Sequence, residues 1–152
     1  MFAICTGLVG CPSGKRDCFS FQPATELSQF ELERFDNRCK QSEGVDVKFI
    51  VLNNPYCLSG NDRVHIFLDE WCVFKGPFSY VADLKVPQKV IERGSAHVRL
   101  YVLRGDRIRN FQDKSVIPIG PEYSTIYGCF FPTNEHNDDQ VHFFSAEYPY
   151  IM

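Results

Sequence analysis

The chain lacks several features that mark common classes of small proteins. It has no Cys-x-x-Cys pair, no Asn-x-Ser/Thr glycosylation site and no Gly-x-Ser-x-Gly nucleophile motif. No apolar stretch approaches the roughly 20 residues that a membrane-spanning helix needs. Its 16 basic residues are outnumbered by 19 acidic ones, for a net charge of −3. These absences argue against a zinc knuckle, a serine hydrolase, a membrane protein and a protein that binds nucleic acid through its phosphates. The oligomeric state is left open.

The seven cysteines are an odd number, and none of them has a partner at zinc-ligand spacing. Without glycosylation sites, this pattern favours reduced, mostly buried thiols over a disulfide framework. We therefore expect an intracellular protein, with no metal and no other cofactor.

Two segments come close to known chemical motifs. In residues 10–16, "GCPSGKR", only three residues separate the glycines of a would-be phosphate loop, and Arg16 replaces the Ser or Thr that would bind magnesium. A second segment gathers metal-capable side chains, but it runs from a polar loop into a strand, so we expect a solvated turn. An enzyme or metal protein would require these residues to converge on one ion: His136, Asp138, Asp139 and His142. We therefore predict no enzymatic activity.

Apolar and polar residues alternate with a period near two from residue 45 onward, and the chain is rich in Phe and Tyr. Both properties are typical of strands. The clearest strands are residues 45–51 and 98–102, and Arg104-Gly105-Asp106 reads as a tight turn rather than an adhesion motif. Further strands are expected at 64–68, 71–80, 84–87, 115–120, 124–131 and 141–148. The pattern predicts an all-β, immunoglobulin-like antiparallel β-sandwich that forms a single domain over residues 1–152.

Residues 1–44 are the least regular part of the chain. Ser28 and Glu31 have the spacing of a capping box, which favours a helical turn. The alternation of Phe30 and Leu32 would suit a strand equally well, so both alternatives stay open here.

Five segments in order resemble the anti-silencing-function family of H3–H4 histone chaperones. They are "VKFIVLNNP" with the following "RVHIFL" (47–68), "VFKGP" (73–77), "HVRLYVL" (97–103), "PIGPEYST" (118–125) and "VHFFSAEY" (141–148). The resemblance covers residues 45–148 and leaves 1–44 as a divergent segment. Between Pro55 and Gly76 the chain is much shorter than the family, and a virus-encoded relative would suit these departures.

The resemblance implies a fold and a way of binding. In the family, one sheet face holds a helix of histone H3, and the tail of H4 adds a strand at a sheet edge. A nuclear location follows, in the host nucleus or in the virion if the chain is viral. The family's partner-binding positions fall on Val98, Leu100, Val102, Lys114, Glu122, Tyr123, Val141 and Phe144.

The same residues have a simpler explanation, because alternation shows that a face is apolar without showing what covers it. The apolar ones could be core residues, and Lys114 could be a solvated lysine. The alternative function is a structural or adaptor β-sandwich, such as a virion or assembly protein, without histone activity. A chaperone requires an exposed apolar patch on the strand over residues 98–103, whereas the alternative requires that face to be covered.

Overall fold

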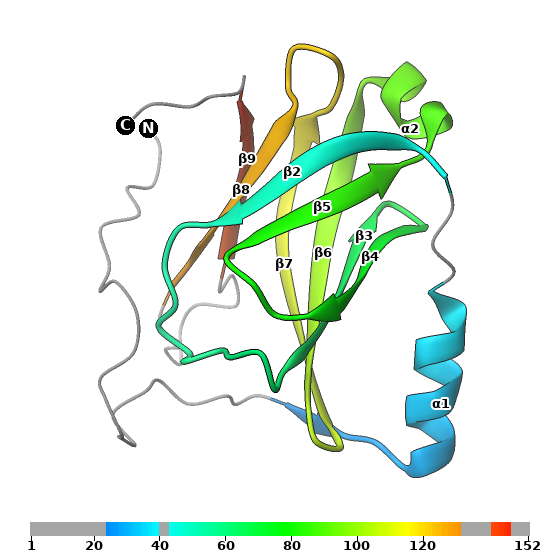
Figure 1. The fold of residues 1–152 in the computed structure, drawn as a ribbon, viewed down its shortest axis with the longest axis vertical. Coiled ribbons are helices and arrows are strands. Elements are labelled where there is room, and N and C mark those ends of the chain that lie inside the picture. Colours follow the sequence, from blue (N-terminus) through cyan, green and yellow to red (C-terminus); the bar gives the residue numbers. More distant parts are fainter. Residues whose placement is uncertain (1–23, 40–42, 132–140, 147–152) are drawn as a thin grey trace.

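Two β-sheets pack face to face in the computed structural model, which describes residues 24–39, 43–131 and 141–146 (Figure 1). One sheet contains β1 (Thr25–Glu26), β3 (Arg63–Leu68), β4 (Trp71–Pro77), β6 (Ser95–Arg104) and β7 (Arg107–Pro118). The other contains β2 (Val45–Val51), β5 (Val81–Val86), β8 (Thr125–Phe130) and β9 (Val141–Ala146). Two helices complete the described chain, α1 (Gln29–Arg38) and α2 (Gln88–Arg93).

The strand order is β1-β7-β6-β3-β4 in the five-stranded sheet and β5-β2-β8-β9 in the four-stranded sheet. All neighbouring strands are antiparallel except β2 and β8, which run parallel. The predicted all-β, immunoglobulin-like sandwich is therefore confirmed. Within the described ranges, neither helix has the length and apolar character needed to cross a bilayer.

The core lies between the two sheets and is built from alternate residues of each strand. On β6, Leu100 pairs with Ile66 of β3 and with Phe111 of β7, and all three side chains are buried. Phe49 and Phe143 belong to the same core cluster from the four-stranded sheet, with their ring centroids 6.1 Å apart. The period-two pattern of the sequence therefore separates the core face of each strand from its outer face.

The phrase "VLNNP" ends β2 with two buried asparagines. Asn53 donates to the carbonyl of Phe130 and accepts from its amide, both at 2.8 Å, which extends the link between β2 and the end of β8. Asn54 makes the same pair of bonds with Leu58, again at 2.8 Å, and also donates to the Tyr80 hydroxyl at 3.1 Å. The two amides thus fix the turn after β2 and hold the Tyr80 ring in place.

The open question about residues 28–32 is settled as a helix. Ser28 and Glu31 form the reciprocal capping box that begins α1. The helix lies over the outer face of the five-stranded sheet, where Phe35 packs on His65 at 4.6 Å and on Tyr101 at 5.2 Å between ring centroids. Figure 1 shows α1 beside the sheet rather than between the layers.

The predicted strands are present with changed boundaries. The piece expected at 84–87 is the edge strand β5, and the strand expected at 115–120 is the end of the longer β7. The turn at residues 104–106 is confirmed, with Gly105 at a φ of 64°. Helix α2 was not predicted; it follows Pro87 and ends at Gly94, whose φ of 83° suits glycine.

Candidate functional site

Three apolar residues of β6 are predicted to bind a partner, but they lie in the core. Val98, Leu100 and Val102 are 1%, 2% and 0% exposed, because they point toward the four-stranded sheet. The expectation that they form an exposed partner-binding face is therefore wrong for the folded chain. Their alternation reports the inner face of a sandwich strand, which is covered by the chain itself.

The other predicted partner-binding residues lie on different elements and faces. Val141 is buried in the core, whereas Phe144 is half-buried on the outer face of the four-stranded sheet and stacks on Tyr127 at 5.2 Å. Lys114 is exposed on β7, Glu122 is exposed, and Tyr123 is half-buried in the turn before β8. These positions do not form one surface.

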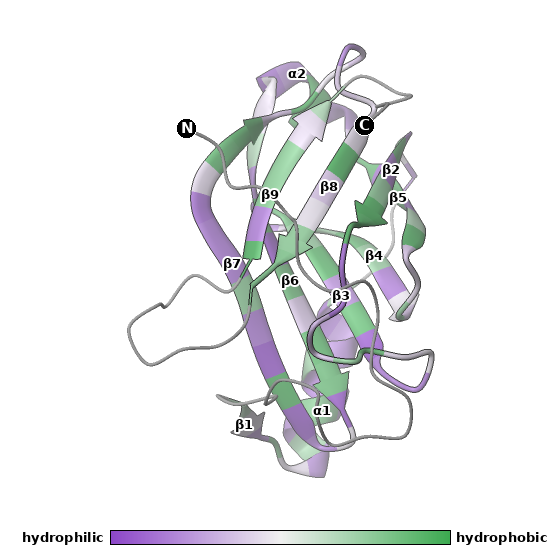
Figure 2. Cartoon of the chain, turned by 90° about the vertical axis from the view of Figure 1, so that its left-hand side faces the viewer, coloured by the Kyte–Doolittle hydropathy of each residue, from purple (hydrophilic) through white to green (hydrophobic). Residues whose placement is uncertain are grey.

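At the edge of β9, where the resemblance would place an added strand, the side chain of Asp113 on β7 bonds to one backbone amide. Asp113 of β7 accepts from the Phe143 amide at 3.2 Å and contacts His142 Nδ1 at 2.9 Å. Burial alone would raise the pKa of Asp113, but bonds from the Ser115 and Phe143 amides and from His142 outweigh it and lower the pKa. Figure 2 shows β7 running alongside β9. An added strand would have to displace Asp113.

The predicted solvated turn with metal-capable residues lies largely outside the described chain. His136, Asp138 and Asp139 are not among the described residues, and neither is the segment 10–16. His142 is described, and it is paired with Asp113 as above.

The cysteines contradict the expectation of reduced thiols. Cys39, at the end of α1, forms a disulfide with Cys72 of β4, with a Cα–Cα distance of 5.2 Å. Cys57 and Cys129 are disulfide-bonded as well. The Cys39–Cys72 bond fastens α1 to the sheet that it covers, which a reduced pair would not do.

His65 of β3 lies beside this disulfide, so that three possible metal ligands meet at one place. One donor atom each from Cys39, His65 and Cys72 lies within 4.8 Å of the others, and all three residues are buried. We call this group the Cys–His cluster. His65 is 0% exposed, and neither of its ring nitrogens has a hydrogen-bond partner. Burial lowers the pKa of His65 to about 4, so the ring is neutral at pH 7.

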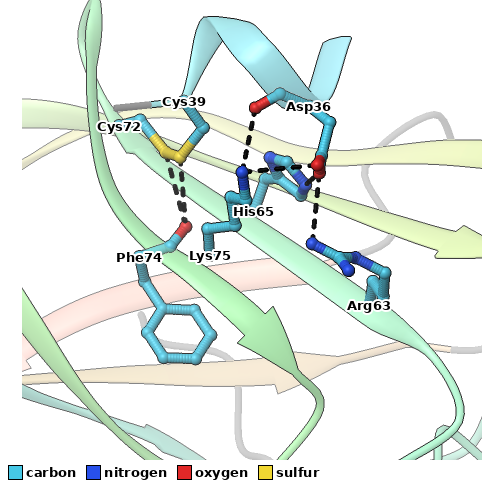
Figure 3. The surroundings of a disulfide bond; sticks show 7 residues. All are labelled: Asp36, Cys39, Arg63, His65, Cys72, Phe74 and Lys75. Carbon is cyan, nitrogen blue, oxygen red and sulfur yellow. Dashed lines mark hydrogen bonds and ion pairs between the residues drawn. A yellow bond between two sulfur atoms is a disulfide. The ribbon is translucent and has the colours of Figure 1, made fainter. Parts of the chain in front are cut away.

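The carboxylate of Asp36 lies beside the His65 ring (Figure 3). Its Oδ1 lies 3.4 Å from His65 Nε2, a distance too long for a good hydrogen bond. Two cations offset its charge: Arg63 at 3.1 Å and Lys75 at 3.3 Å. Asp36 and Cys39 are three residues apart at the end of α1, so the helix places both on the side that faces the sheet.

No spacing pattern in the sequence indicates the Cys–His cluster. Its two cysteines are 33 residues apart, and its histidine alternates with apolar residues on a strand. Only the capping box at Ser28 pointed toward the helix that carries Cys39.

A second candidate site lies at β5, one of the two terminal strands of the four-stranded sheet in the described chain. The Val51 amide donates to the Tyr80 carbonyl at 2.8 Å. In an antiparallel ladder, residues that are hydrogen-bonded to the neighbouring strand alternate with residues that are not. The backbone groups of Ala82 and Leu84 therefore point toward β2, whereas the backbone groups of Asp83 and Lys85 point away from it. Tyr80 and Val81 are 44% and 50% exposed at the start of the strand. We call residues 80–85 the β5 edge.

Comparisons with protein-family models, curated proteins and solved structures found no match to this chain. The resemblance to the histone-chaperone family therefore stays a prediction.

Proposed function

We propose that the chain is a non-catalytic structural or adaptor β-sandwich that binds an extended segment of a partner protein along the β5 edge. One observation carries this proposal: an edge strand with outward-facing backbone groups begins at two exposed apolar residues, Tyr80 and Val81. Strand addition of this kind obtains affinity from main-chain hydrogen bonds and specificity from side chains beside the edge.

Three further observations favour the adaptor over a chaperone that binds as the family does. Leu100 and its neighbours on β6 are covered by the second sheet, and Asp113 bonds to the Phe143 amide at the edge of β9. Disulfides persist in oxidising compartments or on particle surfaces and are rare in the nucleus. The Cys39–Cys72 bond therefore supports an adaptor in such a compartment. Histones H3–H4 remain the partner that the resemblance names.

The side chains of the β5 edge suit a neutral, apolar segment. Asp83 pairs with Lys48 at 2.7 Å and Lys85 pairs with Asp46, so the charges on this outer face are matched within the chain. Charged residues on an edge strand also discourage pairing between copies of the same chain. We expect the bound segment to place an apolar side chain next to Val81.

The test is a selection of displayed random peptides on the parent protein, followed by two variants at one position. Asp83→Pro removes an amide that points away from β2, so an edge strand tolerates it. Asp83→Ala is the matched control, because it removes the same ion pair but keeps the amide. We expect selected peptides to lose about fivefold in affinity for Asp83→Pro and to bind Asp83→Ala as they bind the parent, since one lost backbone hydrogen bond corresponds to about 1 kcal/mol.

Circular dichroism checks that both variants keep the parent fold. The proposal that the β5 edge is a docking site would be refuted if no peptides were selected. It would also be refuted if the selected peptides bound Asp83→Pro as tightly as the parent. Purified H3–H4 is assayed beside the peptides at moderate salt, which weakens nonspecific attraction between an acidic protein and basic histones. Binding that Asp83→Pro weakens selectively would identify histones as partners. Histone binding that disappears as the salt concentration rises would exclude histones as partners.

A further inference from the structure

We propose that the Cys–His cluster is a redox-dependent zinc site. In the oxidised chain both sulfurs belong to the Cys39–Cys72 disulfide. In the reduced chain the two thiolates and the His65 ring would bind one Zn²⁺ ion and hold α1 on the sheet in place of the disulfide. This inference does not depend on the proposed function of the β5 edge.

The donor set and its arrangement fit zinc. Two thiolates and one imidazole are ligands that zinc prefers, and they come here from the end of α1, from β3 and from β4. A tetrahedral zinc ion with its usual bond lengths separates neighbouring donor atoms by about 3.5–3.8 Å. The donors already lie within 4.8 Å of one another, so side-chain rotation after reduction can bring them to these positions.

His65 supplies the independent observation that points to a ligand. It is 0% exposed; Nδ1 has no hydrogen-bond partner, and Nε2 has only the Asp36 carboxylate at 3.4 Å. Buried polar groups in folded proteins nearly always have a partner, so an exception needs an explanation such as an absent ion. With Nε2 facing Asp36 at 3.4 Å, Nδ1 is the nitrogen left for the metal. A carboxylate behind a zinc-bound histidine is a common way to orient the ring.

The charges nearby are compatible with a bound cation. Zinc with two thiolates has no net charge, so Arg63 and Lys75 do not oppose it, and both are already paired with Asp36. Three protein ligands leave the fourth tetrahedral position open to water.

The exchange between the two states requires a reductant, and a small-molecule thiol is sufficient. Two such thiols reduce the Cys39–Cys72 bond: the two cysteine sulfurs gain two electrons and two protons, and the small molecules leave as their own disulfide. Each cysteine thiol then loses its proton when its sulfur binds Zn²⁺, so the ion displaces two protons. A small-molecule disulfide reverses the exchange: the two cysteine thiolates lose two electrons to form the Cys39–Cys72 bond, the small molecule takes up these electrons and two protons and leaves as two thiols, and the ion is released.

The experiment uses the full chain, reduced with dithiothreitol and freed of it without oxygen, and Co²⁺ as a spectroscopic probe for zinc. We expect about one Co²⁺ per chain, with thiolate-to-cobalt charge-transfer bands and the visible bands of tetrahedral cobalt, all removed by added Zn²⁺. Cys39→Ser should lose the two-thiolate spectrum, and His65→Leu should weaken binding at least about tenfold. Cys57→Ser, which changes a cysteine outside the cluster, should leave the spectrum unchanged.

Circular dichroism and thiol alkylation give a second readout. Zn²⁺ should protect Cys39 and Cys72 from alkylation but leave the half-buried Cys57 as reactive as it is in the metal-free reduced chain. The proposal is overturned if the reduced parent shows no thiolate bands. It is also overturned if both cluster variants bind as the parent does, or if the reduced chain is unfolded and Zn²⁺ does not refold it.

Discussion

Leu100 provides the sharpest stability prediction, because the sequence allowed it to be either a binding residue or a core residue. It is 2% exposed and lies between Ile66 and Phe111 in the middle of the five-stranded sheet. Leu100→Ala removes buried methyl groups and leaves a cavity, which costs about 2–5 kcal/mol, and we expect about 3 kcal/mol for this central position. Leu100→Arg would bury an unpaired charge and should prevent folding.

The assay is urea unfolding, followed by the fluorescence of the single tryptophan, Trp71, and by circular dichroism. With a slope of about 1.5–2 kcal/mol per molar urea, a loss of about 3 kcal/mol lowers the midpoint by about 1.5–2 M. Val116→Ala is the matched control, because Val116 is 61% exposed on the same sheet and should change stability by less than about 0.5 kcal/mol. A folded Leu100→Arg, or a Leu100→Ala as stable as the Val116 control, would refute the placement of Leu100 in the core.

Three further predictions concern other parts of the chain. Burial lowers the pKa of His65 from 6.5 to about 4, so between these pH values the unfolded chain binds more protons than the folded one. Acidification through this pH range should therefore lower the free energy of unfolding of the parent by up to about 3 kcal/mol, a loss that His65→Leu does not show. Equal losses for the two proteins in urea unfolding at several pH values would contradict this prediction. Replacing both Cys39 and Cys72 by Ser removes the disulfide between residues 33 positions apart. The loss of this cross-link should lower the free energy of unfolding by about 3–4 kcal/mol on the chain-entropy estimate, which is measured as a lower Tm. An unchanged Tm would show that the bond does not stabilise the fold. Asn53→Ala leaves the buried amide and carbonyl of Phe130 without partners and should lower the free energy of unfolding, measured in urea, by about 2–3 kcal/mol. The control Asn61→Ala changes an exposed residue and should lower it by less than about 0.5 kcal/mol. Similar values for the two variants would argue against the link between β2 and β8.

Much of the fold was predictable because an alternating strand with one buried face has a recognisable pattern. The strands at 45–51 and 98–102 were placed on this basis, and both are present. The first half of β7 was missed because Arg109 and Asp113 occupy inward positions there, which breaks the apolar alternation. Arg109 is accommodated by the rings of Tyr56 and Phe111, at 4.8 and 4.5 Å, a contact that no local pattern reveals.

The candidate sites were less predictable, since they depend on contacts between distant segments. Alternation could not distinguish a core face from a binding face at Leu100; only the position of the second sheet does so. The cysteine count could not give a pairing, and Cys39 meets Cys72 only because α1 lies over β3 and β4. The bonds of Asn53 to Phe130 and of Asn54 to Tyr80 likewise depend on the fold, because they join segments far apart in the sequence.

Hydrogen exchange at β5 is the most direct measurement of the proposed function. In the free chain the amides of Ala82 and Leu84 face β2 and should exchange slowly, whereas those of Asp83 and Lys85 point outward and should exchange fast. A bound extended segment should slow Asp83 and Lys85 and leave the other two nearly unchanged. Protection that appears on other strands, with Asp83 and Lys85 still fast, would contradict strand addition at the β5 edge.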